Sequence, residues 1–176
     1  DVTRHTGGSS GGSASAVAAG ECTLTLGSDT GGSIRMPAGL CGVLGLKTTF
    51  GRLSLHGLMG LSPTMDHYGP MVRTVEDCAL MLRVIAGHDP KDPTSSKVPV
   101  PDYKKALTGK VSGLRIGLVK EFFEIPVDPE VKQAVQAALK VLEELGATVV
   151  EVSWPMFHYT FAISTTILAA DTAGSL

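Results

Sequence analysis

Apolar positions along the chain follow a helical period in two segments and form short continuous runs in others. The clearest helix is predicted from about Val75 to Ala86, where apolar side chains recur every three or four residues and share one face. Thr74 is a good N-cap for this helix, and Asp77, three residues later, is the acid of a capping box. Gly87 follows the last apolar position, so we expect the helix to end there.

A strand–helix–strand unit is predicted over residues 114–153. Residues 114–119 (LRIGLV) form an apolar run typical of a buried strand, and residues 147–152 (ATVVEV) predict a second strand. Between them, Asp128 and Pro129 are the N-cap and first residue of an amphipathic helix. Because strands joined by a covering helix pair in parallel through a right-handed crossover, this pattern predicts the α/β class.

The composition divides the chain into four zones of one domain. Residues 1–60 are rich in small residues, residues 61–113 hold the first helix and a Pro-rich surface connection, residues 114–153 form the scaffold unit, and residues 154–176 start a further segment. The chain begins inside a Gly/Ser-rich loop and stops after an apolar segment that has no obvious cap. We therefore expect it to be a fragment of a longer chain.

Charge and cysteine content narrow the function classes. The net charge of -2 gives no basic footprint for nucleic acid, and the longest apolar stretch is too short to span a bilayer. Three cysteines, an odd number at no metal-ligand spacing, predict reduced thiols rather than a metal site. With no apolar signal core at the N-terminus, these features favour a soluble cytoplasmic protein.

Glycine is unevenly distributed, with 14 of the 21 glycines in residues 1–60. They concentrate in two loops that also carry hydroxyls, residues 7–13 (GGSSGGS) and residues 27–35 (GSDTGGSIR). A flexible linker is the plain alternative, but the first loop runs directly into a good helix former at residues 14–19. Residues 42–48 (GVLGLKT) do not match a phosphate-binding loop, because a residue separates Gly45 from Lys47 where that motif requires the glycine and the lysine to be adjacent.

Two serine loops favour acyl-transfer chemistry. Residues 8–12 match the G-x-S-x-G nucleophile elbow, but the preceding residues 1–6 are too polar to form the buried strand that it requires. A serine hydroxyl can instead be activated by a histidine or by a lysine of lowered pKa. The Gly31-Gly32-Ser33 backbone could aim several N–H groups at a developing oxyanion.

Paired motifs at specific spacing identify a family. The chain closely resembles the amidase signature family in residues 7–20 (GGSSGGSASAVAAG), 27–37 (GSDTGGSIRMP), 41–47 (CGVLGLK) and 51–54 (GRLS), and more loosely in residues 66–74 (DHYGPMVRT) and 87–94 (GHDPKDPT). The resemblance implies an amidase signature fold, in which a mixed sheet is layered between helices (α/β/α), of which this chain is part. It also implies an amidase that hydrolyses a carboxamide to an acid and ammonia or an amine.

The resemblance implies a Ser/cis-Ser/Lys triad without cofactor or metal. Ser33 matches the nucleophile, Ser9 the bridging serine with its unusual cis peptide, and Ser10 a supporting serine. The backbone N–H groups of Thr30, Gly31, Gly32 and Ser33 match the oxyanion hole. Asp29 and Arg35 flank the loop, where we expect them to hold it by an ion pair rather than to orient substrate.

The catalytic lysine of the family lies upstream of the first Gly/Ser loop, so this chain alone is expected to be inactive or nearly so. Lys47 belongs to a structural Gly-Leu-Lys motif, and His5 is a rival base for which a surface role is the more common one. Thr6 and Thr48 stand where the family commonly has proline, which should alter loop stiffness rather than chemistry.

Three functions stay open. The leading one is a stand-alone amidase that acts on a small-molecule amide and can form a homodimer, which residues 66–70 and 168–171 favour. The second is the A subunit of a glutamyl-tRNA(Gln)/aspartyl-tRNA(Asn) amidotransferase, a glutaminase with partner subunits, which residues 87–103 and the strand–helix–strand unit favour. The third is a non-catalytic scaffold or binding module that lacks the lysine. None of them involves a membrane or direct contact with nucleic acid.

Overall fold

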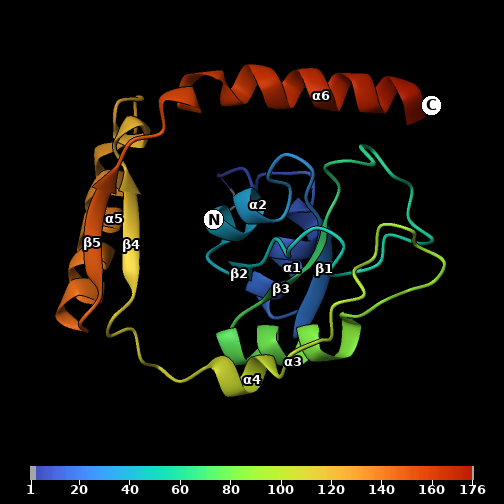
Figure 1. Ribbon diagram of the computed structural model, residues 1–176, viewed down its shortest axis with the longest axis horizontal. Coiled ribbons are helices and arrows are strands. Elements are labelled where there is room, and N and C mark those ends of the chain that lie inside the picture. Colours follow the sequence, from blue (N-terminus) through green and yellow to red (C-terminus); the bar gives the residue numbers. More distant parts are fainter. Residues whose placement is uncertain (1–2, 176) are drawn as a thin grey trace. The chain divides into compact units, whose positions relative to one another are not determined.

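The computed structural model describes residues 3–175 and divides them into two compact units (Figure 1). One unit contains the chain up to Leu107 together with the segment from Thr166 onward, and the other is Thr108–Thr165. The first unit carries α1 (Gly11–Ala19), β1 (Leu24–Ser28), α2 (Arg35–Cys41), β2 (Leu44–Gly45), β3 (Tyr68–Val72), α3 (Val75–Ile85) and α4 (Tyr103–Ala106). The α/β class is as predicted.

The sheet of the first unit is antiparallel, in the order β1-β3-β2. Its central strand, β3, pairs with β1 in a register that runs from Leu24 opposite Val72 to Ser28 opposite Tyr68. The strand that comes last in the sequence therefore lies between the other two, and its partners in β1 precede it by 40 to 48 positions.

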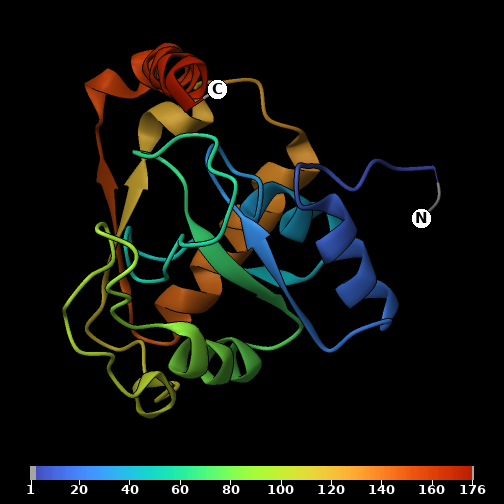
Figure 2. The same ribbon diagram turned by 90° about the vertical axis from the view of Figure 1, so that its right-hand side faces the viewer.

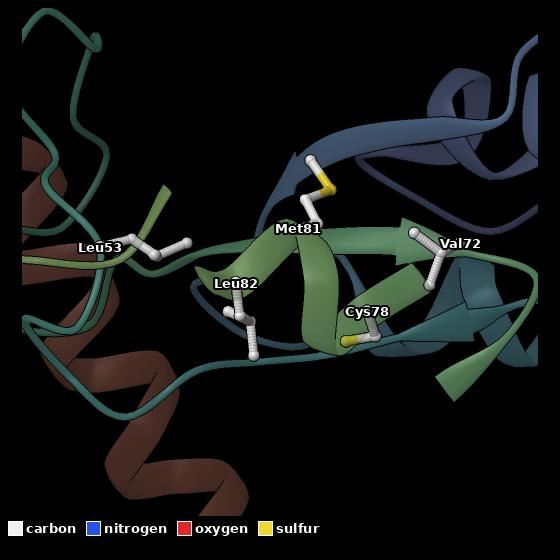
Figure 3. Close-up of a cluster of buried hydrophobic side chains, with 5 residues drawn as sticks. All are labelled: Leu53, Val72, Cys78, Met81 and Leu82. Atoms are coloured by element: carbon white, nitrogen blue, oxygen red, sulfur yellow. The ribbon is translucent and has the colours of Figure 1, made fainter. Parts of the chain in front are cut away.

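Helices cover both faces of this sheet. Successive residues of a strand point to opposite faces, and Met71 and Val72 of β3 belong to two different buried clusters. Met71 packs with residues of α1 and α2, whereas Val72 packs with Cys78, Met81 and other residues of α3 (Figure 3). Figure 2 shows α1 and α3 on opposite sides of β1 and β3. This arrangement is the predicted α/β/α layering.

Capping residues position the helix α3 as the sequence predicts. The Thr74 side chain accepts a hydrogen bond from the backbone N–H of Asp77 at 3.1 Å, and the helix ends at Ile85. Helix α1 begins at Gly11, three residues before the predicted start, because the loop glycines already take helical conformation. The Pro-rich connection after α3 has turns but no helix or strand before Tyr103, and its polar residues Asp92 and Ser95 are buried.

The second unit is the predicted strand–helix–strand arrangement. Its strands β4 (Arg115–Val119) and β5 (Thr148–Val152) pair in parallel, with α5 (Pro129–Glu144) between them in the chain. Asp128 caps α5 by accepting the N–H of Glu130 at 2.8 Å. The prediction of a buried strand at 114–119 is wrong, because β4 is half-buried to exposed. Two strands and one helix provide too little surface to enclose a strand on both faces.

Shorter elements complete the chain. The 3₁₀ helices η1 (Lys120–Phe123) and η2 (Pro155–Tyr159) belong to the second unit, and α6 (Thr160–Ser175) continues from that unit into the first. No helix within residues 3–175 is long and apolar enough to cross a membrane. Cys22, Cys41 and Cys78 are free thiols, and burial raises the pKa of the Cys78 thiol.

Candidate active site

A cavity of about 480 Å³ in the first unit brings together the two serine loops. Ser9 of the first loop and Thr30 and Ser33 of the second line it, together with Asp66 and Tyr68. The rest of the wall is contributed by residues 55–61, Pro63 and residues 91–94, which include several apolar side chains. Hydroxyls that lie 24 positions apart in the sequence therefore face one cavity.

The first loop contains a glycine of positive φ and the cis peptide bond that the resemblance implies. Gly7 has a φ of 78°, which favours glycine, and a Cβ there would come within 3.1 Å of Pro37 Cα. The Gly8–Ser9 peptide bond is cis. Ser9 is exposed and lines the cavity, so its hydroxyl is accessible from there.

Ser10 ties the two loops together. Its backbone N–H donates to the carbonyl oxygen of Ser33 at 3.2 Å. Its O–H donates to the carbonyl oxygen of Ser28 and its hydroxyl oxygen accepts the Ser28 N–H, both at 3.2 Å. Ser10 does not line the cavity, so its contacts are those of a supporting residue that sets the distance between the loops.

Asp29 is the anchor of the second loop. Its side chain is 0% exposed and accepts the backbone N–H of Gly32 at 2.8 Å and of Ile34 at 3.3 Å. Arg35 adds two side-chain hydrogen bonds to the same carboxylate, each 3.0 Å long. Lys47 Nζ lies 3.6 Å from Asp29 Oδ1, so this lysine belongs to the anchor and not to the cavity wall.

The environment of Asp29 keeps it ionised. Burial by itself raises the pKa of the Asp29 carboxyl, but the hydrogen bonds and positive charge of Arg35 more than offset it, with help from the N–H groups of Arg35 and Ile34. The pKa falls from its ordinary value of 3.8 to about 2. Asp29 therefore stays a carboxylate at neutral pH, and its contacts are those of loop support rather than substrate binding.

The backbone N–H groups of the second loop are not equivalent. The N–H of Gly32 donates to Asp29 Oδ1, so it is engaged inside the protein, and the predicted oxyanion hole loses this member. Asp29 competes for it because a buried carboxylate needs several donors. The N–H groups of Thr30, Gly31 and Ser33 donate to no acceptor among residues 3–175. They stay open to a ligand.

The pairing of β1 with β3 continues past the strands into the site. Asp29 and His67 exchange both backbone hydrogen bonds, at 2.9 and 3.2 Å, directly after the Ser28–Tyr68 pair. The next opposed residues in this register are Thr30 and Asp66. The Thr30 hydroxyl donates to Asp66 Oδ1 at 2.5 Å. Because side chains alternate along a strand, Ser28 and Thr30 face the cavity while Asp29 points inward.

The rival base does not reach the cavity. His5 is exposed and its Nδ1 accepts the N–H of Gly7 at 2.8 Å, so this nitrogen carries no proton in that contact. His67, whose backbone pairs with that of Asp29 in the second loop, places its Nδ1 2.7 Å from the carbonyl oxygen of Met65. Within the described residues, no group of three or more His, Cys, Asp or Glu side chains could hold a metal ion.

Comparison with known proteins identifies the family. A family model described as amidase matches residues 1–176. The chain belongs to the amidase signature family. Among curated relatives of this family member, the A subunit of glutamyl-tRNA(Gln) amidotransferase from Roseiflexus sp. (strain RS-1) is 53% identical over 100% of the chain and 36% of its own length. The chain thus spans about a third of the relatives that it matches.

Solved structures agree with this assignment to the amidase signature family. The corresponding amidotransferase protein from Thermotoga maritima has a TM-score of 0.93 and 41% identity, covering 96% of this chain and 37% of its own. The peptide amidase of Stenotrophomonas maltophilia has a TM-score of 0.88 and 35% identity, covering 100% of this chain and 37% of its own. The fold is therefore shared by proteins named for both kinds of activity.

Two polar residues of this amidase signature chain were not predicted as site residues. Asp66 lies in the cavity wall, and Asp171 of α6 accepts the hydroxyls of Ser62 and Thr64 at 2.5 and 2.6 Å. These hydrogen bonds lower the pKa of Asp171. Both aspartates occur in segments whose only sequence signal is likeness to the family. Their partners lie 36 and more than 100 residues away, so no local pattern indicated their contacts.

Proposed function

We propose that the whole protein cleaves a carboxamide through an acyl-enzyme formed on Ser33. The observation that carries this proposal is the position of Ser33 on a cavity that it shares with Ser9 and with the open N–H groups of its own loop. A nucleophile, a second hydroxyl for proton transfer and unengaged amide donors are the parts that acyl transfer needs. Because the chain covers about a third of its relatives, the activity is proposed for the whole protein.

The reaction begins when the Ser33 oxygen attacks the amide carbonyl carbon. The Ser33 proton passes to Ser9, whose own proton moves to a base, and the resemblance assigns that base to a lysine upstream of this chain. The carbonyl oxygen becomes an oxyanion, which the N–H groups of Thr30, Gly31 and Ser33 stabilise in place of the four-donor set that the resemblance implies. The C–N bond breaks as the leaving nitrogen takes back the proton, and water then hydrolyses the ester to release the acid.

The electrostatics of the loop suit this role. Asp29 carries a negative charge just behind the oxyanion donors, but Arg35 and Lys47 neutralise it, so it does not repel a developing oxyanion. Few other charged side chains occur in residues 1–60. Amide donors act more strongly where little water screens them.

Glutamine is the substrate that the comparisons favour. Curated relatives named as the A subunit of the amidotransferase are 51% to 58% identical. Among the solved structures, the amidotransferase protein is 41% identical, whereas the aryl acylamidase and peptide amidase structures are 34% to 36% identical. This margin supports a glutaminase that supplies ammonia to partner subunits over a stand-alone amidase. The free cysteines remain the basis for a cytoplasmic location.

A comparison of variants of the whole protein tests the proposal. Ammonia release from glutamine is measured with and without co-expressed partner subunits, and from simple aliphatic and aryl amides. We expect Ser33→Ala to abolish release and mass spectrometry to find an acyl adduct on Ser33 in the parent protein. Ammonia release that survives Ser33→Ala but is lost in His5→Ala would refute the assignment.

The same experiment separates the other two functions. Glutaminase activity that depends on partner subunits supports the amidotransferase component, and hydrolysis of amides by the isolated protein supports the stand-alone amidase. Sequencing the gene upstream of Asp1 addresses the non-catalytic alternative. A lysine in an apolar segment there supports the enzyme, and its absence supports a binding module.

A further inference from the structure

Thr30 and Asp66 meet because of strand register. In an antiparallel ladder, hydrogen-bonded pairs alternate with pairs whose side chains come closer together. Asp29 and His67 form a hydrogen-bonded pair, so the next pair, Thr30 and Asp66, is of the closer kind. The hydrogen bond between Thr30 Oγ1 and Asp66 Oδ1 follows from this geometry.

Asp66 divides its two carboxylate oxygens between two segments. Oδ1 accepts the Thr30 hydroxyl, while Oδ2 accepts the backbone N–H of Leu61 at 2.7 Å and of Ser62 at 3.0 Å. The Asp66 N–H closes the turn by donating to the carbonyl of Ser62 at 2.8 Å. One carboxylate therefore joins the loop with the open N–H groups to the wall segment 61–66.

We propose that Asp66 is a positioning residue, which fixes the Thr30 end of the oxyanion loop for acyl transfer by accepting the Thr30 hydroxyl. This inference rests on the proposed function and adds a residue to it. Asp29 holds the other part of the same loop through Gly32, Ile34 and Arg35. Thr30 is the part that Asp29 does not reach, so Asp66 is its side-chain anchor.

The wall segment is itself held firmly enough to serve as a support. Asp171 accepts the hydroxyls of Ser62 and Thr64. Asp66 thus connects Thr30 to a segment anchored on α6. A donor displaced by about 1 Å can reduce catalysis on the order of a hundredfold, so such an anchor matters for rate.

Thr30→Val tests the inference in the whole protein with its partner subunits, because valine keeps the shape of threonine and removes the hydroxyl. We expect kcat for ammonia release to fall about tenfold to a hundredfold with KM changed less than about threefold. Thr30→Ser restores the hydroxyl and should return kcat to within about threefold of the parent.

Thr25→Val is the matched control. It removes the hydroxyl of a threonine in β1 whose hydrogen bond, 3.3 Å long, goes to the carbonyl oxygen of Ser13, and Thr25 neither lines the cavity nor contacts the wall segment. We expect kcat to stay within about twofold of the parent. Equal losses of kcat in Thr25→Val and Thr30→Val would overturn the inference.

Asp66→Asn examines the other partner. An amide group has a single acceptor atom, so it cannot serve Thr30 and the two N–H groups together. We expect the loss of kcat in Thr30→Val/Asp66→Asn to equal that of Asp66→Asn alone, because the two residues act through one contact. Multiplicative losses, or a Thr30→Val protein that is less stable but retains its kcat, would refute positioning through this hydrogen bond.

Failure of the inference and failure of the proposed function give different results. If Ser33 is not the nucleophile, Ser33→Ala retains activity and no acyl adduct forms on Ser33 in any variant. If only the inference fails, Ser33→Ala is inactive and the adduct forms in Thr30→Val at the parent rate.

Discussion

Arg35 reaches back to Asp29 with two side-chain nitrogens, and its Nε and Nη2 lie 3.0 Å from different carboxylate oxygens. The pair closes a ring of chain that contains residues 30–34. Asp29 is fully buried, whereas the Arg35 side chain is 54% exposed. The carboxylate has lost its contact with water, and the hydrogen bonds and charge of this arginine replace much of that lost hydration. The arginine itself retains access to water.

Arg35→Met should destabilise the protein through this pair. Methionine keeps most of the aliphatic length but leaves a buried carboxylate with fewer donors. We expect the free energy of unfolding to fall by about 2 kcal/mol, less than for a fully buried pair because Arg35 is half exposed. Urea unfolding of the whole protein measures this loss. Arg83→Met, at an exposed arginine of α3, is the control and should change stability by less than about 0.5 kcal/mol.

Acid sensitivity follows from the same carboxylate. The pKa of Asp29 is lowered from 3.8 to about 2 in the folded protein, so its ionisation stabilises the fold above about pH 4. That contribution is lost as the pH falls from 4 towards 2. We expect Asp29→Asn, although less stable at pH 7, to show a weaker dependence of unfolding free energy on pH over this window. A parallel pH dependence in the two proteins would contradict the lowered pKa.

Ser9 and Ser10 are neighbours with different expected roles, which makes them a matched pair. Ser9→Ala should reduce kcat by about a thousandfold, because it removes a group that transfers protons. Ser10→Ala should reduce it by less than about tenfold and lower the free energy of unfolding by about 1 kcal/mol, because it breaks two neutral hydrogen bonds to Ser28. Kinetics and urea unfolding of the whole protein distinguish the two. A larger loss of kcat in Ser10→Ala than in Ser9→Ala would contradict the roles assigned to the two serines.

Gly69 should not tolerate a side chain. A Cβ on this residue of β3 would lie 1.9 Å from the carbonyl oxygen of Leu46, a backbone atom that cannot move aside without displacing the segment after β2. We expect Gly69→Ala to lower the free energy of unfolding by about 3 kcal/mol. Gly39→Ala in α2, where a Cβ meets nothing within 4 Å, should instead raise it by about 0.5 kcal/mol. Thermal unfolding of both variants provides the comparison.

Signals that act over a few residues made parts of the fold predictable. Thr74 and Asp128 both cap the helices that the sequence predicts, because a cap and the N–H that it accepts lie within three positions. The parallel pairing of β4 and β5 followed from the connecting helix. The burial of β4 could not be predicted in the same way. An apolar run shows that a strand can be covered, but not how much neighbouring structure covers it.

The site was predictable only where one motif contains it. Residues 7–13 and 27–35 carry the serines and the glycines in recognisable order, and the resemblance assigned roles to them. The capture of the Gly32 N–H by Asp29 depends on how the loop closes, which residue types alone do not specify. The contact of Thr30 with Asp66 depends on the register of two strands separated by about forty residues.

The central place of β3 also sets an order of events during synthesis. A ribosome releases the chain from its N-terminus, so the segments with Ser9 and Ser33 emerge before residues 68–72. Until β3 inserts between β1 and β2, neither the Asp29–His67 ladder nor the two buried clusters on its faces can form. Because the entropy of loop closure is lost before such distant residues gain their contacts, this pairing forms slowly. The nascent chain thus leaves the β1 edge unpaired for a time, which is when a chaperone would have most reason to bind it.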